Sequence, residues 1–220
     1  MNSPRTELAP LIEYQLLRAD ATRQEIEQGC AEALEHRFRS VWAHGSRVTQ
    51  AVALLGERDI KTAAVVAYPF GAMDSDAKRF ETEAAIDNGA QEINVALNMG
   101  WLKEREDSLV LRELRDVIEA ADERDVGVML DLALLSRDRI IAGCKLITES
   151  GAKSVIASPG FGGAAPTVEQ IRFLRETLES RFAVIAAGPI LDPVAAFGLR
   201  EAGATRLATA DAVGLMQRLE

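Results

Sequence analysis

Three titratable side chains, Glu13, His44 and Asp131, are the candidates for acid–base chemistry in this sequence. Each lies in or at the end of a short segment with strand-like composition. Apolar surroundings raise the pKa of a carboxyl group, and an imidazole gains or loses its proton near neutral pH. Gathered in one pocket, these groups could donate and accept protons during a reaction. The alternative is a structural role for each, such as holding a loop or a backbone N–H group.

The segments that would position these residues alternate between short β-rich runs and longer amphipathic helices. Eight runs are predicted to be strands: residues 13–17, 40–44, 62–68, 92–97, 126–131, 154–157, 183–187 and 206–209. Such alternation is typical of a parallel sheet with crossover helices. The 220 residues suit a compact eight-unit α/β barrel. We therefore predict an α/β fold, a single (β/α)8 TIM barrel over residues 1–220 with a short N-terminal extension.

Helix starts are predicted from residues that cap helices. Asp20, Asp74, Thr167 and Asp192 each precede a helix-forming run, and Pro193 follows Asp192 at the first helical position. No Ser/Gly-rich linker or block of charge divides the chain, which agrees with one domain.

Composition limits the class of partner. The formal net charge is −9, and a negative protein lacks the positive surface that nucleic acid or anionic lipid requires. The longest weakly polar run, residues 62–73, is too short to cross a bilayer. The N-terminus lacks the apolar core of a secretion signal, so we expect a cytoplasmic protein. Its expected partners are a small-molecule ligand and either further copies of the chain or another protein.

The cysteines and histidines indicate neither a disulfide framework nor a metal site. Cys30 and Cys144 are isolated thiols, each within a predicted helix. His44 with scattered carboxylates supplies no recognised ligand spacing, because His36 lies on a predicted helix. We therefore predict no metal and no cofactor.

Several segments resemble, in chain order, those of the deoxyribose-phosphate aldolase family. Residues 151–162, GAKSVIASPGFG, resemble the family's G-A-D-F-V-K-T-S-T-G-F-G. The other matching segments are 16–22 (LLRADAT), 68–71 (YPFG), 92–100 (EINVALNMG), 184–190 (VIAAGPI) and 201–209 (EAGATRLAT). The resemblance implies the TIM-barrel fold of class I aldolases, with the active site at the carboxyl ends of the strands.

The resemblance also identifies where this chain departs from the family's chemistry. Ile156 stands at the position of the imine-forming lysine, Ile185 at that of a second lysine, and Asn94 at that of a proton-relay aspartate. An isoleucine cannot form an imine, and an asparagine cannot accept a proton. None of the chain's five lysines is placed by its strand or helix to replace the missing amine. We therefore predict that imine chemistry is closed to this chain.

The family's phosphate subsite corresponds to residues 187–189 and to Ala210-Asp211. Pro189 removes a backbone donor there. The carboxylate of Asp211 would repel a phosphate by about 4 kcal/mol per charge pair at about 4 Å and an effective dielectric constant near 20. The other interpretation of Asp211 is an N-cap for a helix over residues 212–219. On either interpretation the predicted ligand is not phosphorylated.

Inward-facing positions follow from the resemblance, because the family's lysine points into the barrel. Alternation along each strand then places the remaining inward side chains. The predicted catalytic residues are Glu13, His44 and Asp131, and the predicted substrate-binding residues are Gln15, Trp42, Asn94, Asn98, Ile156, Ser158, Ile185 and Asp211. Trp42 either fills the space that the lysines vacate or forms a stacking wall for a planar ligand.

Three functions remain open at this point. The first is a lysine-independent acid–base step, catalysed by a lyase, isomerase or cyclase, on a small unphosphorylated carbonyl compound. The second is a catalytically inactive barrel that binds a ligand or a partner protein. The third is a deoxyribose-phosphate aldolase, which rests on the resemblance alone.

Overall fold

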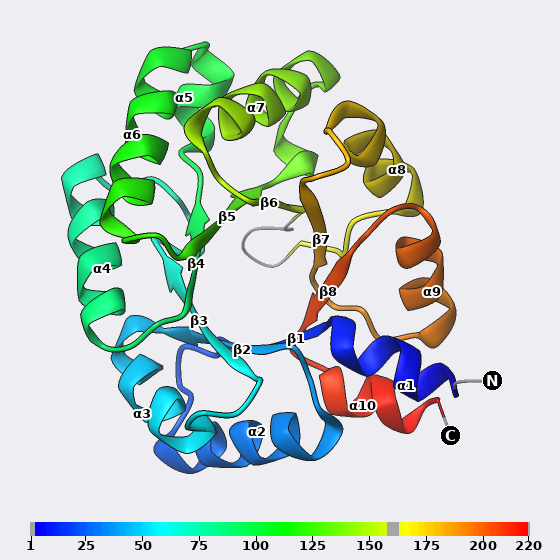
Figure 1. The fold of residues 1–220 in the computed structure, drawn as a ribbon. Helices are drawn as coiled ribbons and strands as arrows, with labels where there is room; N and C mark the ends of the chain where they lie inside the picture. Colours follow the sequence, from blue (N-terminus) through cyan, green and yellow to red (C-terminus); the bar gives the residue numbers. More distant parts are fainter. Residues whose placement is uncertain (1–2, 158–162, 220) are drawn as a thin grey trace.

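The computed structural model describes residues 3–157 and 163–219, in which eight parallel strands close into one barrel in sequential order (Figure 1). The ring closes where β1 pairs with β8. The strands are β1 Ile12–Leu16, β2 Ser40–His44, β3 Lys61–Val66, β4 Glu92–Ala96, β5 Asp125–Leu130, β6 Ser154–Ala157, β7 Ala183–Ala187 and β8 Arg206–Thr209. The predicted TIM barrel is confirmed. The third strand ends two residues earlier than predicted, because Ala67 takes a positive φ of 53°, which interrupts the extended conformation.

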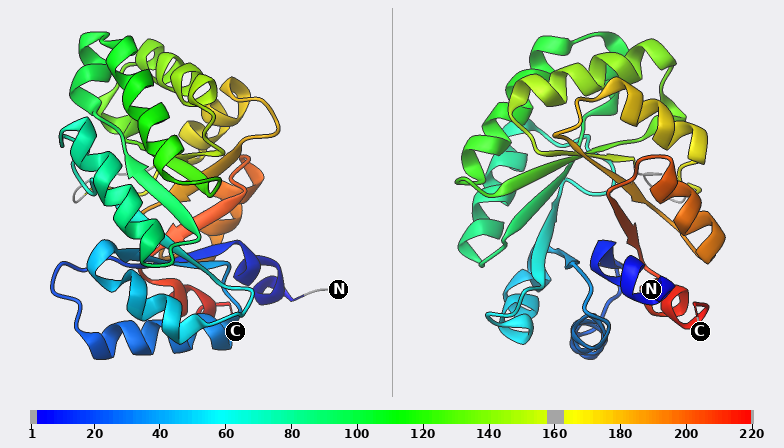
Figure 2. Two further views of the ribbon diagram at one scale, coloured as in Figure 1. Left: turned by 60° about the vertical axis from the view of Figure 1, so that its left-hand side comes forward. Right: turned by 45° about the vertical axis from the view of Figure 1, so that its right-hand side comes forward.

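Helices surround the barrel, and α1 lies beside α10 near the two ends of the chain (Figures 1 and 2). The short N-terminal extension is α1 with the 3₁₀ turn η1. The helices are α1 Pro4–Leu8, η1 Ala9–Leu11, α2 Arg23–His36, α3 Gly45–Leu55, α4 Ser75–Asp87, α5 Met99–Glu104, α6 Asp107–Ala120, η2 Leu132–Leu134, α7 Arg137–Ser150, α8 Val168–Thr177, α9 Pro193–Glu201 and α10 Ala212–Gln217. Within the described ranges, no helix is long and apolar enough to cross a membrane.

Three of the four predicted helix caps are confirmed, at Asp74, Thr167 and Asp192. The prediction for Asp20 was wrong. Thr22 caps α2, because its hydroxyl accepts from Glu25 N while the Glu25 carboxylate accepts from Thr22 N. The Asp20 carboxylate instead pairs with Arg18 at 2.8 Å.

Two apolar clusters form the core. One lies between the strands and the helices and contains both cysteines, whose pKa values burial raises to about 11 for Cys30 and about 12 for Cys144. The other fills the inside of the barrel and consists of inward-facing side chains: Trp42, Ala63, Val65, Ala96, Met129, Ile156, Ile185, Ala187 and Ala208. The inward positions predicted for Trp42, Ile156 and Ile185 agree with this cluster. Trp42 has no exposed surface, which favours its interpretation as a filler of the barrel.

Candidate functional site

His44 is the candidate acid–base residue that lines a cavity at the carboxyl ends of the strands. It is the last residue of β2, and the cavity of about 460 Å³ is bounded by the β1–α2 loop, the start of α3 and one residue of α4. The lining residues are Leu16, Arg18, Ala19, Ala21, His44, Gly45, Ser46, Arg47 and Glu81. The cavity thus brings an imidazole, a hydroxyl and two guanidinium groups to one side of the barrel mouth.

The contacts of His44 fix the orientation of its ring. Nε2 lies 3.1 Å from Leu17 O, and the ring centroid lies 5.9 Å from that of Tyr68. A carbonyl oxygen only accepts, so Nε2 carries the proton in this hydrogen bond. In the neutral ring Nδ1 then keeps its lone pair, as a general base requires.

Asp131 follows β5, which is separated from β2 around the ring by β3 and β4. Its carboxylate accepts from Ala133 N at 3.0 Å and caps the turn η2. This contact agrees with the structural role that the sequence analysis gave as the alternative to acid–base chemistry for Asp131. Asp131 therefore belongs to the rim of the mouth but does not share the cavity of His44.

Glu13 lies at the opposite end of the barrel from the expected pocket. It is the second residue of β1, is 1% exposed, and accepts from Trp42 Nε1 at 2.9 Å. Arg206 Nη1 and Arg39 Nη1 lie 3.3 and 3.4 Å from its carboxylate. Burial raises the pKa of Glu13, and the two guanidinium groups only partly offset this effect. Alternation had predicted the inward direction of this side chain but not its height along the barrel axis.

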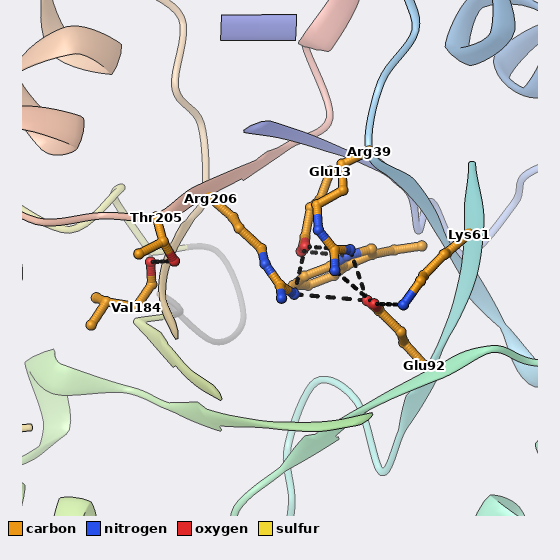
Figure 3. A network of polar contacts seen from close by, with 8 residues as sticks. Glu13, Arg39, Lys61, Glu92, Val184, Thr205 and Arg206 are labelled. Atoms are coloured by element: carbon orange, nitrogen blue, oxygen red, sulfur yellow. Dashed lines mark hydrogen bonds and ion pairs between the residues drawn. The ribbon is translucent and has the colours of Figure 1, made fainter. Parts of the chain in front are cut away.

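Glu13 belongs to an ion network across the amino-terminal end of the barrel (Figure 3), which we call the floor network. Its members are Glu13, Arg39, Lys61, Glu92 and Arg206. Arg39 binds Glu92 through two hydrogen bonds of 2.8 and 3.0 Å, and Lys61 Nζ lies 2.9 Å from Glu92. Burial acts to raise the pKa of Glu92, but hydrogen bonds and charge from Arg39 and Lys61 outweigh it and lower that pKa.

Sequence reasoning missed most of the floor network. A signal was present, because Lys61, Glu92 and Arg206 are each the first residue of a strand. Charged residues at the start of successive strands converge at the amino-terminal end of a barrel, where they contribute to stability more often than to catalysis.

The two isoleucines that the resemblance sets at lysine positions lie side by side in the apolar interior of the barrel. Ile156 on β6 is paired in register with Ile185 on β7, and the two residues are 0% and 1% exposed. Met129 is the registered neighbour of Ile156 on β5. Asn94 is also buried, at 4% exposure, on the inside of β4. These side chains therefore fill the inside of the barrel and line neither cavity at the strand ends.

Close packing around Gly127 supports a first prediction. A Cβ at Gly127 would lie 2.7 Å from side-chain atoms of Asn94 and of Ser154, and 3.0 Å from Ile156 Cδ1. We expect Gly127→Ala to lower the free energy of unfolding by about 1–3 kcal/mol, because buried neighbours must shift to admit the methyl group. Urea denaturation measures this loss. Gly45→Ala is the matched control, since a Cβ there meets no atom within 4 Å; an equal loss in both variants would contradict the packing argument.

All five lysines lie in the described residues, and none of them places its ammonium group inside the barrel towards the mouth. Lys61 belongs to the floor network, and Lys103, Lys145 and Lys153 are exposed. Lys78 on α4 is fully buried but lies outside the barrel wall, where Nζ is 2.7 Å from Glu113 of α6 and 2.9 Å from Ala96 O at the end of β4.

The remaining predicted binding residues surround the mouth without converging. Gln15 is half-buried and lines a second cavity of about 230 Å³ between β1 and α2, while Asn98 caps α5 by accepting from Trp101 N at 3.2 Å. Asp211 occupies the N-cap position of α10, but its side chain makes no capping hydrogen bond and pairs instead with Arg218. Ser158 lies outside the described residues. Over the described ranges, no group of three or more His, Cys, Asp and Glu side chains could hold a metal ion.

Comparisons with known proteins identify the family. The chain is 40% identical over 210 residues to the deoxyribose-phosphate aldolase of Alkaliphilus oremlandii, covering 95% of each chain, and 38% identical to that of Bdellovibrio bacteriovorus, covering 96% of each. A crystal structure from Coccidioides immitis, provisionally a deoxyribose-phosphate aldolase, superposes with a TM-score of 0.93 at 30% identity over 99% of this chain and 86% of its own. The tetrameric aldolase of Aeropyrum pernix shares the fold, with a TM-score of 0.90 at 22% identity over 99% of this chain and 92% of its own.

No family profile matches the chain. The full-length identity to the curated aldolases nevertheless extends over almost the whole of both sequences, and the barrel superposes on solved members from end to end. The chain belongs to the deoxyribose-phosphate aldolase family, whose members are lyases.

Proposed function

We propose that this chain is a lysine-independent member of the family that performs an acid–base step on a small, unphosphorylated carbonyl compound. The observation that supports the proposal most directly is the placement of His44, with Nδ1 available as a base, in a cavity of about 460 Å³ at the strand ends. In this proposal Nδ1 removes a proton next to the carbonyl group. A guanidinium group of the same cavity, from Arg18 or Arg47, would stabilise the negative charge that develops on the carbonyl oxygen.

The apolar centre of the barrel supports the lysine-independent part of the proposal. Ile156 and Ile185 occupy the positions at which the family resemblance places amines, and neither can bond covalently to an aldehyde. The ion pair between Asp211 and Arg218 supports an unphosphorylated ligand. The Asp211 carboxylate already neutralises the Arg218 guanidinium group, which could otherwise attract a phosphate.

A second candidate function is deoxyribose-phosphate aldolase itself. Identity of 40% over 95% of both chains to a curated aldolase favours it. This activity requires an amine that forms an imine with the aldehyde, and that requirement separates the two candidates in one experiment.

The discriminating experiment is borohydride reduction of the protein in the presence of deoxyribose 5-phosphate or acetaldehyde. We expect no adduct on any lysine, because none of the five lysines, all of which lie in the described residues, reaches the inside of the barrel from the mouth side. Intact-protein and peptide mass spectrometry would detect a reduced adduct if one formed. The Alkaliphilus oremlandii aldolase, treated in parallel, is the positive control. An adduct mapped to a single lysine would support the aldolase and refute the lysine-independent proposal.

The third possibility, a ligand-binding or partner-binding barrel without activity, is tested by the same protein preparations. Binding of a carbonyl compound without turnover would favour it. We also propose that the chain forms a homo-oligomer, as the tetrameric Aeropyrum pernix aldolase does. Native mass spectrometry would establish its stoichiometry, and a second polypeptide in fixed ratio would instead support the partner protein.

A further inference from the structure

The second end of the barrel carries a cavity that the proposed function does not use. It has a volume of about 400 Å³ and lies at the amino-terminal ends of β5 to β8, opposite the mouth. Its lining comes from the last turn of α7, from the first residues of β5, β7 and β8, and from the loops that precede β6 and β7. The lining residues are Asp125, Thr148, Gly151, Ala152, Lys153, Arg181, Phe182, Ala183 and Arg206. We call it the floor cavity.

Three cationic side chains from separate segments face one carboxylate in the floor cavity. Lys153 precedes β6, Arg181 precedes β7, and Arg206 opens β8, whereas Asp125 supplies the only carboxylate of the lining. When their ion partners are included, five cations (Arg39, Lys61, Lys153, Arg181 and Arg206) meet four carboxylates (Glu13, Glu92, Asp125 and Glu179), so a small positive excess remains in a chain whose formal net charge is −9. A negatively charged ligand is therefore favoured here over a cation or a neutral molecule.

The hydrogen-bond inventory of the floor cavity also favours an anion. A guanidinium group has five N–H donors and an ammonium group three. Within the described part of the chain, Arg206 directs one hydrogen bond to Glu13, Arg181 directs one to Glu179, and Lys153 makes none through its side chain. Most donors around the cavity are thus available, so a matching ligand must be rich in acceptor oxygens.

The floor network behind the cavity holds Arg206 in place. Its side chain is only 20% exposed, and Nη1 lies 3.3 Å from Glu13 and 3.8 Å from Glu92 (Figure 3). These two carboxylates orient one edge of the guanidinium group towards the barrel axis. Arg181 is positioned differently, since its guanidinium carbon lies 5.0 Å from the centroid of the Phe182 ring.

We propose that the floor cavity binds a phosphate dianion, either free phosphate or the phosphate group of a small metabolite. Planar guanidinium groups match the paired oxygens of phosphate, and a flexible ammonium group adds a point charge. The site is independent of the chemistry proposed at the mouth, because it lies at the opposite end of the barrel and shares no residue with the cavity of His44.

The test is isothermal titration calorimetry of the full chain with inorganic phosphate, and separately with glycerol phosphate, at constant ionic strength. The double variant Lys153→Ala/Arg181→Ala removes two cations of the floor cavity and leaves the floor network intact. The matched control, Lys145→Ala/Arg172→Ala, removes two exposed cations from α7 and α8 that do not line the cavity. Both double variants change the net charge by the same amount, so a general electrostatic effect would appear equally in both.

We expect saturable binding of phosphate to the wild type and to the control variant, and an affinity at least about tenfold lower in Lys153→Ala/Arg181→Ala. Tighter binding of glycerol phosphate than of inorganic phosphate would identify a metabolite as the source, and the reverse order would identify free phosphate. Absence of saturable heat in the wild type, or equal affinities in the two double variants, would overturn the proposal.

Discussion

Replacing Lys78 by Met is expected to lower the free energy of unfolding by about 3–5 kcal/mol, the largest loss of stability expected from a single substitution here. Lys78 and Glu113 form an ion pair whose two side chains are both 0% exposed. Without the ammonium group, the Glu113 carboxylate would remain buried with no cation, and Ala96 O would lose its donor. Urea denaturation followed by circular dichroism would measure the loss.

The pH dependence of the Lys78→Met variant provides a second measurement. Burial already raises the pKa of Glu113 above its ordinary value of 4.5, and Lys78 now opposes that rise. A carboxyl group with a raised pKa in the folded state contributes stability at low pH that is lost as the pH rises through the folded value. The deficit of Lys78→Met relative to the wild type should therefore increase from about pH 5 to about pH 8.

Two control variants separate the buried pair from general effects of removing a lysine. Lys145→Met removes an exposed ion pair with Glu149 and should change stability by no more than about 0.5 kcal/mol. The double variant Lys78→Met/Glu113→Leu removes both buried charges and should recover much of the loss. If Lys78→Met lowers the free energy of unfolding by no more than Lys145→Met does, the buried ion pair does not stabilise the packing of α4 and α6 at the end of β4.

Replacing His44 by Asn is expected to reduce acid–base turnover by about 10²- to 10⁴-fold, the ordinary contribution of a positioned general base. The assay follows exchange of protons next to the carbonyl group of acetaldehyde, hydroxyacetone and dihydroxyacetone in D₂O by proton NMR. Asn cannot take up the proton that Nδ1 would accept, and its shorter amide does not reach Leu17 O as Nε2 does, but that contact is a single part-buried hydrogen bond at the end of β2. The loss should therefore fall on turnover while the fold is retained.

His36→Asn is the matched control for this experiment, since His36 is the chain's only other histidine. It ends α2, where Nδ1 lies 2.9 Å from Arg5 Nη2 on the outside of the barrel. We expect His36→Asn to exchange protons at the wild-type rate. Exchange that survives unchanged in His44→Asn would remove His44 from the proposed machinery, and absence of exchange in the wild type for every compound would favour a ligand-binding barrel.

Asp131→Asn tests the remaining candidate at the mouth. The carboxylate caps η2 through Ala133 N, and an asparagine side chain can accept the same hydrogen bond. A purely structural role therefore predicts exchange within about twofold of the wild-type rate, whereas participation in proton transfer predicts a loss of about 10²-fold or more. The ratio of the two rates decides between these roles.

The sequence was sufficient for the fold because its signals are local. Four strands, among them β2 and β6, begin and end at the predicted residues. The family resemblance set Ile156 inward, and the matching positions of the other strands then placed Trp42 and Ile185 on the same side. Side-chain direction in a strand is set by the backbone of the strand itself, with a period of two residues. The alignment with the family then adds the identity of the barrel but not the chemistry of its centre.

The height of each residue along the barrel could not be read from the sequence. Height depends on the stagger between neighbouring strands, which is a property of the closed sheet. Glu13 was therefore predicted at the mouth with His44, whereas its contacts place it at the floor with Arg39 and Arg206.

The amino-acid sequence by itself determined the parallel barrel, the aliphatic side chains at its centre and the absence of an inward lysine on β6 and β7. Tertiary structure decided which charges meet: Lys78 with Glu113, Asp211 with Arg218, and Arg206 with Glu13. It also decided that His44 lines a cavity and that Lys153 and Arg206 share another. The physical reason is that local periodicity is encoded within a few residues, whereas pairing of side chains depends on how segments far apart in the chain pack against one another.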